Sequence, residues 1–176
     1  ALRGGRAMLT LGFERAGWAD MTEVDRQYAH LLAAYDTAID HHTTLYPGAL
    51  DAVRALRADG YSVSICTNKP AGLAEKLVRS LGVRDDFDAL IGADTLPTRK
   101  PDPAPFWAAV DQAGGDRTKC LLVGDTQTDR ATSTNAGVPS ILVTFGPAGG
   151  EMAALEPDAL LADYGDLHTT VRDLIG

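Results

Sequence analysis

Cysteine is scarce in this sequence of 176 residues, and no apolar run approaches the roughly 20 residues that a membrane-spanning helix needs. The two cysteines, Cys66 and Cys120, show no CxxC spacing and lie in or beside strand-like runs. We interpret both as small residues in or near the core, not as metal or redox groups. The first residues, ALRGGRAML, lack the apolar segment of a signal peptide. We therefore expect a cytoplasmic protein that has no membrane partner.

Basic residues are also fewer than acidic residues in this sequence. Sixteen basic residues against 24 acidic ones give a formal net charge of −8. This balance excludes nucleic acid and anionic membranes as general partners, so any anionic ligand must be held by a local site. Only four of the basic residues are lysines, and the other twelve are arginines.

The pattern of apolar residues changes near residue 45. Before it, we predict only helices, one over residues 5–17 and a second that is capped by Thr22 and ends near His41 and His42. After it, helices and strands alternate. The predicted helices cover residues 48–60, 70–82, 103–114, 128–137 and 166–176, and the predicted strands cover 61–67, 88–93, 119–124, 139–144 and 157–163.

Two of these strands, CLLVG and ILVT, are continuously apolar, which is typical of parallel strands covered on both faces. The sequence therefore predicts an α/β fold with a Rossmann-like parallel sheet and flanking helices over residues 46–176, preceded by a helical segment over residues 1–45. In such a sheet, functional groups gather just after the carboxyl ends of the strands.

Three segments occupy that position. In the first, SICTNKP, Thr67 and Asn68 precede a helix that begins near Pro70, and the hydroxyl and the helix amides could form an anion pocket. A threonine that only caps the helix is the alternative. In the second, TRKPDPAPFW, Lys100 stands on a loop stiffened by alternating prolines, where a compact ammonium suits a phosphate. A solvated loop lysine is the alternative.

The third segment is LLVGDTQTD. Asp125 and Asp129 are four residues apart at the start of a helix, so both carboxylates could face one site and bind a hard cation such as Mg²⁺. A structural role is also open, with Asp125 or Thr126 as the helix cap and Asp129 complementing the helix dipole.

The order and spacing of these segments resemble the haloacid dehalogenase-like superfamily, and within it the phosphoglycolate phosphatase group with a helical cap. The matching pieces are LYPGALDAVRALRADGYSVSICTNKP, IGADTLPTRKPDPAPF, LLVGDTQTDRATSTNAGVPSILVTFG and ADYGDL. The resemblance implies a partial cap over residues 1–45, an α/β core over residues 46–176, and a Mg²⁺-dependent phosphatase that works through an aspartyl-phosphate.

The same resemblance implies roles for individual residues. Thr67 and Asn68 would bind the phosphoryl oxygens, and Lys100 would neutralise the developing negative charge. Asp125 would bind Mg²⁺, and Asp129 would support the metal site from the helix. The substrate would be a small phosphorylated metabolite, with 2-phosphoglycolate the leading candidate.

One piece of the family pattern is absent from the sequence: a strand that ends in D-x-D-G-T and carries the nucleophile. The only D-x-D here, Asp86 and Asp88, precedes a strand, so we interpret it as structural. We expect an N-terminally truncated, inactive chain without the first core strand, which the family places between the strands ending at Thr67 and Gly124. The two strands would then expose apolar edges or pair directly, and a homo-oligomer or a strand-swapped association could result.

Two other hypotheses remain open. The chain could be a non-catalytic relative that binds a phosphorylated ligand or a protein. It could instead have another activity of capped family members, such as that of a sugar-phosphate mutase or phosphatase; a dehalogenase, which needs no metal, is disfavoured by Asp125 and Asp129.

Overall fold

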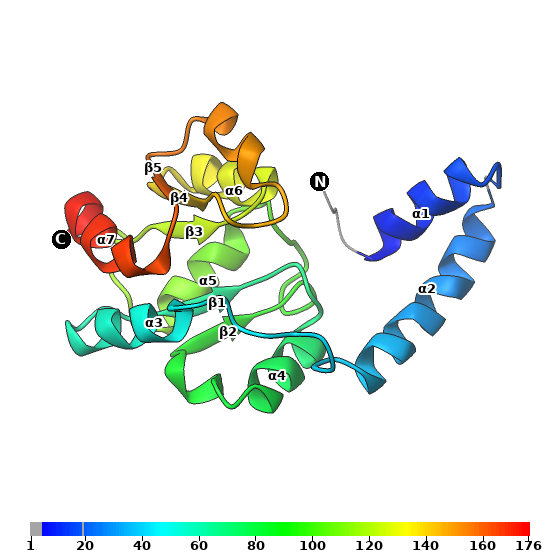
Figure 1. Ribbon diagram of the computed structural model, residues 1–176, viewed down its shortest axis with the longest axis horizontal. Helices are drawn as coiled ribbons and strands as arrows, with labels where there is room; N and C mark the ends of the chain where they lie inside the picture. The colour runs from blue at the N-terminus through cyan, green and yellow to red at the C-terminus, as the bar shows by residue number, and fades with distance from the viewer. Residues whose placement is uncertain (1–4, 19) are drawn as a thin grey trace. The chain divides into compact units, whose positions relative to one another are not determined.

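The computed structural model describes residues 5–18 and 20–176 and divides into two compact units, one up to Thr43 and one over Thr44–Gly176 (Figure 1). The partial cap that we predict over residues 1–45 includes residues 1–4 and 19, which lie outside the described part of the chain. Within that part, no helix combines the length and the apolar character that crossing a membrane requires.

The first unit is a helix pair. Helix α1 covers Gly5–Arg15 and packs against α2, which covers Met21–Thr37, and an ion pair joins Arg6 to Asp25 at 2.6 Å. The predicted cap at Thr22 was wrong. Asp20 caps α2 instead, because its side chain accepts hydrogen bonds from the backbone N–H groups of Thr22 and Glu23.

The second unit alternates helices and strands in the predicted order. The strands are β1 (Ser64–Cys66), β2 (Ala89–Ile91), β3 (Leu122–Gly124), β4 (Ser140–Val143) and β5 (Ala159–Leu161). The helices are α3 (Ala49–Ala58), α4 (Ala71–Ser80), α5 (Ala104–Gln112), α6 (Gln127–Ala136) and α7 (Leu167–Ile175). Short 3-10 segments cover Arg84–Asp86, Gly149–Leu155 and Tyr164–Asp166. The segment Gly149–Leu155 was not predicted.

All strand pairs are parallel, as predicted, but they fall into two groups. β1 pairs with β2, and β3 pairs with β4, which pairs with β5. No described residue forms a ladder between β1 and β3. Of the two outcomes expected for these strands, the structure therefore has the open edges and not the direct pairing.

Apolar residues cover both faces of the strands. One cluster joins α3 and α7 to β4 and β5 through Leu56, Val171, Ile141 and Leu161, and Leu121 packs against it. A second cluster joins Phe106 and Val110 of α5 to Leu122. Leu121 directly precedes β3 and Leu122 is its first residue, and these successive side chains belong to different clusters, as expected for opposite faces of a sheet. The clusters are therefore the two layers of an α/β fold.

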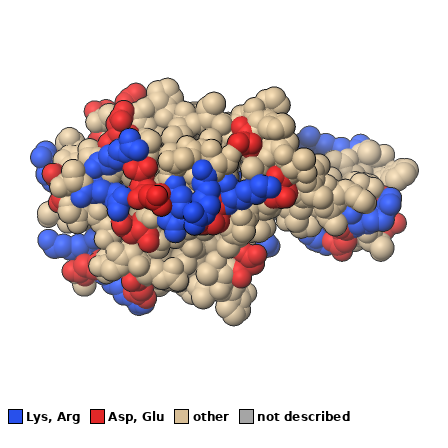
Figure 2. Space-filling model, turned by 90° about the horizontal axis from the view of Figure 1, so that it is seen from below, with Lys and Arg blue, Asp and Glu red and all other residues tan. Residues whose placement is uncertain are grey.

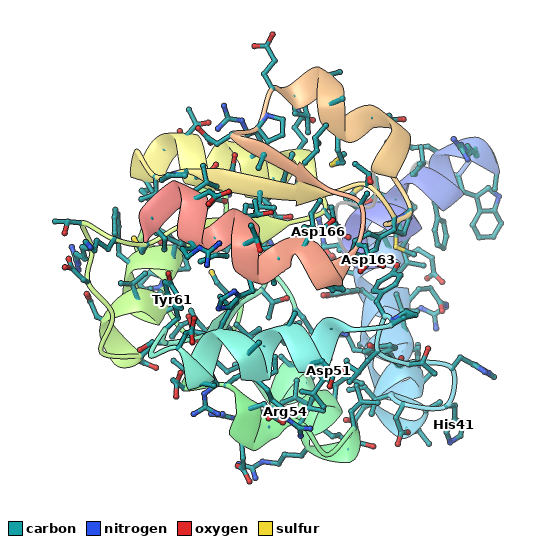
Figure 3. All side chains as sticks on the ribbon, turned by 60° about the vertical axis from the view of Figure 1, so that its left-hand side comes forward. His41, Asp51, Arg54, Tyr61, Asp163 and Asp166 are labelled. Atoms are coloured by element: carbon teal, nitrogen blue, oxygen red, sulfur yellow. The ribbon has the colours of Figure 1, made fainter. Side chains whose placement is uncertain are left out.

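Figure 3 shows α3 and α7 side by side, with Asp51 and Arg54 on α3 and with Asp163 and Asp166 just before α7.

The D-x-D sequence has the structural role that we inferred for it. Asp86 forms an ion pair with Arg54 at 2.7 Å, and Asp88 forms one with Arg57 at 2.8 Å. The second carboxylate oxygen of Asp88 also accepts a hydrogen bond from the backbone N–H of Val63, just before β1. Figure 2 shows one face of the molecule, on which basic and acidic side chains are interleaved. Through these ion pairs and this hydrogen bond, the two carboxylates connect α3 to the chain just before β1.

Candidate active site

Three segments that follow strands meet at the side chain of Lys100. Its Nζ atom donates a hydrogen bond to the backbone oxygen of Cys66, the last residue of β1, at 2.7 Å. The same atom lies 2.6 Å from Oδ1 of Asp129 in the first turn of α6, which follows β3. The ends of β1 and β3 are therefore joined through one ammonium group.

The loop that carries Lys100 is held at two points. The side-chain amide of Asn68 donates to the backbone oxygen of Lys100 at 2.9 Å, and that of Asn135 donates to the backbone oxygen of Pro101 at 2.9 Å. The Lys100–Pro101 peptide bond is cis. The Lys100 side chain is only 10% exposed. Lys100 is thus buried and fixed, unlike a solvated loop lysine.

Asp129 has a structural role at the start of α6, and its carboxylate also binds Lys100. Thr126 is the N-cap of α6, and it forms a capping box with Asp129. The hydroxyl of Thr126 accepts a hydrogen bond from the backbone N–H of Asp129. The carboxylate of Asp129 in turn accepts a hydrogen bond from the backbone N–H of Thr126. The Thr126 hydroxyl also lies 2.6 Å from Oδ2 of Asp129. With Oδ1 bound to Lys100, both carboxylate oxygens have partners within the chain.

Gly124 allows this packing. A Cβ atom at Gly124 would lie 2.3 Å from the Cβ atom of Asp129, so any larger residue would collide with it. Because Gly124 has no side chain, Asp129 can pack closely against the end of β3.

Asp125 is more accessible than Asp129. Its side chain is exposed, yet partial desolvation and then the neighbouring Asp129 carboxylate raise its pKa above the ordinary value, despite the opposing effect of Lys100. Desolvation also raises the pKa of Tyr164, and the negative charge of Asp125 adds to this effect. Both pKa shifts arise first from desolvation, and a neighbouring carboxylate adds to each of them.

Thr67 and Asn68 lie at the end of β1, next to Lys100. The backbone N–H of Thr67 extends the ladder to the Ile91 oxygen at 2.9 Å, and the hydroxyl oxygen of Thr67 accepts from the backbone N–H of Lys69 at 3.1 Å. The Thr67 hydroxyl can still donate a hydrogen bond to an anion. Thr67 therefore does not simply cap a helix, because α4 begins later, at Ala71.

Sequence reasoning missed Asp94 and Asn135. Oδ1 of Asp94 accepts from the first N–H of α4, at Ala71, at 2.7 Å, so this amide is not open to an anion. Asp94 follows β2, and the rule that selected the other segments could also have found it. Asn135 lies in the last turn of a polar helix, where no sequence pattern distinguishes it.

The donor set suits Mg²⁺, which is commonly held by one or two carboxylates together with water and substrate phosphate. Asp125 offers a carboxylate of this kind, whereas the oxygens of Asp129 are engaged with Lys100 and Thr126. Within the described residues, no group of three or more acidic, His or Cys side chains could hold a metal by itself. A cation here would take Asp125 together with external oxygen ligands.

Comparison with known proteins identifies the family of this chain. The model of the haloacid dehalogenase-like hydrolase family matches residues 13–143. The chain belongs to that family. It is 40% identical to a phosphoglycolate phosphatase of Rhodospirillum rubrum over 92% of this chain and 67% of that one. It is 36% identical to a phosphoglycolate phosphatase of Mesorhizobium japonicum, over 97% of this chain and 75% of the relative.

Solved structures show the same fold for this haloacid dehalogenase-like hydrolase. A predicted phosphoglycolate phosphatase from Haemophilus somnus 129PT aligns with a TM-score of 0.78 at 26% identity, over 92% of this chain and 73% of that chain. A hydrolase of the same superfamily from Geobacter sulfurreducens aligns with a TM-score of 0.69 at 20% identity, over 99% of this chain and 74% of that one. The Rossmann-like α/β fold predicted from the sequence is confirmed.

Proposed function

We propose that the chain carries the phosphate-binding and metal-binding groups of a Mg²⁺-dependent phosphatase that acts on a small phosphate monoester, with 2-phosphoglycolate the first candidate. The observation that carries the proposal is the buried Lys100, whose Nζ lies 2.7 Å from the end of β1 and 2.6 Å from Asp129. The names of the relatives from Rhodospirillum rubrum and Mesorhizobium japonicum support the choice of substrate.

Each residue has a distinct task in this proposal. The hydroxyl of Thr67 and the backbone N–H of Asn68 donate to phosphoryl oxygens, and Lys100 offsets the negative charge that develops on them. Asp129 positions Lys100, and the side chain of Asn68 holds the Lys100 loop by donating to the backbone oxygen of Lys100. Phosphoryl transfer depends mainly on such positioning and charge stabilisation.

Asp125 would hold Mg²⁺, which when bound neutralises negative charge on the phosphate. Asp129 would support this site without direct ligation, because both of its oxygens are already bonded.

The reaction is the hydrolysis of a phosphate ester to an alcohol and inorganic phosphate through an aspartyl-phosphate. The attacking carboxylate belongs to a D-x-D-G-T motif, and the 176 residues contain no such motif. We therefore expect this chain to bind the substrate without turning it over.

Isothermal titration of the chain with 2-phosphoglycolate in the presence of Mg²⁺ tests the proposal. We expect saturable binding that weakens at least fivefold in Thr67→Val, which removes the hydroxyl but keeps the shape of the side chain. Thr98→Val, at an exposed threonine of the same loop region as Lys100, is the matched control and should bind as the unmodified chain does.

Two results would contradict the proposal. Absence of binding, or equal binding by the Thr67→Val variant, would show that Thr67 does not form a phosphate-binding site. Robust Mg²⁺-dependent phosphate release by the chain would instead show that a nucleophile exists among these residues and that our assignment of the missing motif is wrong.

A further inference from the structure

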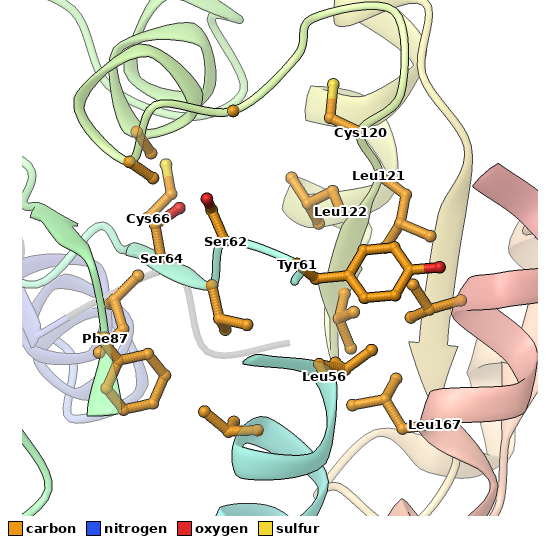
Figure 4. Close-up of a pocket in the computed structure, with 18 of the residues that line it drawn as sticks. Leu56, Tyr61, Ser62, Ser64, Cys66, Phe87, Cys120, Leu121, Leu122 and Leu167 are labelled. Carbon is orange, nitrogen blue, oxygen red and sulfur yellow. The ribbon is translucent and has the colours of Figure 1, made fainter. Parts of the chain in front are cut away.

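The loop from Thr67 to Ala71 joins β1 to α4 and carries the phosphate-binding groups of the proposed function. On one side, β1 pairs with β2. On the other side, Ser64 and Cys66 border a cavity of about 780 Å³ (Figure 4). The hydrogen bonds that hold the end of β1 and this loop therefore come from the β2 side and from the segment of Lys100.

The chain that follows β2 bonds this loop at three successive points. The backbone N–H of Thr67 donates to the oxygen of the last residue of β2 at 2.9 Å, and that of Ala93 donates to the backbone oxygen of Lys69 at 2.9 Å. Oδ1 of Asp94 then accepts from the backbone N–H of Ala71 at 2.7 Å. Because the loop is bonded at both ends and in the middle, its peptide groups have little freedom to rotate.

Gly92 brings Asp94 to the start of α4. A Cβ atom at Gly92 would lie 2.4 Å from both the backbone N and the Cα atom of Ala71, so only glycine allows this approach. The N–H of Gly92 donates to the hydroxyl of Thr95 at 2.9 Å, and the N–H of Thr95 donates to the oxygen of Gly92 at 3.3 Å. The two residues close a turn, and Asp94 lies within it.

The carboxylate of Asp94 lies where a helix attracts anions. The N–H groups at a helix N-terminus and the helix dipole together favour negative charge. Helix α4 has ten residues, no acidic residue in its first turn, and an N-cap, Pro70, that forms no side-chain hydrogen bond. Asp94 supplies the missing carboxylate from another segment of the chain, and the first N–H of the helix is bonded to it.

We propose that Asp94 is a positioning residue of the phosphate site: it holds the loop and occupies the N-terminus of α4, so that phosphate binds to Thr67 and Asn68 and not to the helix amides. This inference rests on the proposed function and adds to it the residue that determines where the anion binds. Asp94 acts through the backbone of the loop and not by contact with the substrate.

The test follows the backbone amide signals of Asn68 and Ala71 by NMR while the 176-residue chain is titrated with inorganic phosphate in the presence of Mg²⁺. Asp94→Ala removes the acceptor, and Asp94→Asn keeps an acceptor oxygen but removes the charge. The Asp94 side chain is exposed, so its loss leaves no cavity. Asp20→Ala is the matched control, because Asp20 is an exposed aspartate that accepts from the backbone at the start of α2.

In the unmodified chain, we expect phosphate to shift the Asn68 signal saturably and to leave the Ala71 signal in place. In Asp94→Ala, the affinity reported by Asn68 should fall about fivefold, the equivalent of one lost hydrogen bond. The Ala71 signal should now shift as well, because the helix N-terminus is open to the anion. Asp94→Asn and Asp20→Ala should keep the pattern and the affinity of the unmodified chain.

Amide hydrogen exchange without phosphate or metal examines the loop by itself. The Ala71 amide should exchange about tenfold faster in Asp94→Ala, since its hydrogen bond is lost, and Asp94→Asn should recover most of the protection. Exchange at Ile141, which is fully buried in β4, should be the same in all variants and shows that each of them is folded. This result does not depend on whether the proposed function is correct.

Four outcomes would overturn the inference. In the first, Asp94→Ala exchanges and responds to phosphate as the unmodified chain does. In the second, phosphate binding weakens but the Ala71 signal does not respond, so Asp94 only stabilises the loop. In the third, Asp94→Asn behaves as Asp94→Ala, so the charge acts and not the hydrogen bond. In the fourth, the unmodified chain binds no phosphate although exchange follows the expected pattern; the proposed function then fails, and Asp94 holds the loop without directing an anion.

Discussion

The ammonium group of Lys100 lies 2.6 Å from the carboxylate of Asp129, and the two side chains are 10% and 8% exposed. The pair joins a loop to the first turn of α6, and Lys100 also bonds the last carbonyl of β1. Removing either charge would leave the other buried without compensation, which costs more than the intact pair contributes.

Loss of one member of this pair should destabilise the chain severely. We expect Lys100→Met or Asp129→Asn alone to lower the free energy of unfolding by about 3–5 kcal/mol, and the double variant to lose less than the sum of both. Urea denaturation of the four proteins gives the coupling energy. Lys119→Met, at an exposed lysine, should change stability by less than about 0.5 kcal/mol. Additive losses would mean that the two charges do not depend on each other.

The capping box of α6 gives a second, smaller effect. Thr126→Ala removes the hydroxyl that accepts from the Asp129 N–H and bonds the Asp129 carboxylate, so we expect a loss of about 1 kcal/mol by thermal or urea unfolding. Thr126→Ser keeps the hydroxyl and should recover most of it. If the serine variant is as unstable as the alanine variant, the methyl group of Thr126, and not its hydrogen bond, matters.

The order of helices and strands in residues 46–176 was predictable from the sequence because Gly and Pro mark the ends of most elements and because CLLVG and ILVT are continuously apolar, which is typical of parallel strands. The predicted strands were too long, since the spacing of apolar residues does not show where ladder pairing stops. The Thr22 cap failed for a related reason: Asp20 and Thr22 are both good caps, and only the backbone geometry selects one.

The candidate site was predictable only in part. The position of each polar residue after a strand selected Thr67, Lys100, Asp125 and Asp129, because parallel strands bring such residues to one edge. Their partners could not be predicted: Lys100 bonds a backbone carbonyl of Cys66, and Asn135 holds the loop from a helix 34 positions further along the chain. Such contacts depend on packing and leave no pattern in the sequence.

Asp125 and Asp111 should affect the pH dependence of the free energy of unfolding in opposite directions. The pKa of Asp125 is raised, so the folded chain binds a proton more readily than the unfolded chain, and ionisation of Asp125 lowers stability as pH rises through its folded pKa. Asp125→Asn should therefore be more stable, relative to the unmodified chain, at pH 7 than at pH 3. Urea midpoints measured across this range test the difference.

Asp111 provides the control of opposite sign. A hydrogen bond from Arg117 lowers its pKa, so its contribution to stability is present above the ordinary pKa of Asp and disappears as pH falls through the folded value. Asp111→Asn should lose stability at pH 7, and the loss should vanish in acid. The same pH trend in both variants would refute the assignment for Asp125.

Two glycines should respond oppositely to the same change. At Gly124, an added Cβ atom would lie 2.3 Å from the Cβ atom of Asp129, so Gly124→Ala must displace Asp129 from Lys100 or bend the end of β3. We expect a loss of about 1–3 kcal/mol, which is typical of overpacking. At Gly72, within α4, an added Cβ atom has nothing within 4 Å, and Gly72→Ala should stabilise the chain by about 0.5–1 kcal/mol. Thermal unfolding of both variants measures these effects. A Gly124→Ala variant as stable as the unmodified chain would show that the end of β3 can yield without loss, and the tight contact between Gly124 and Asp129 would then have no part in holding the ion pair.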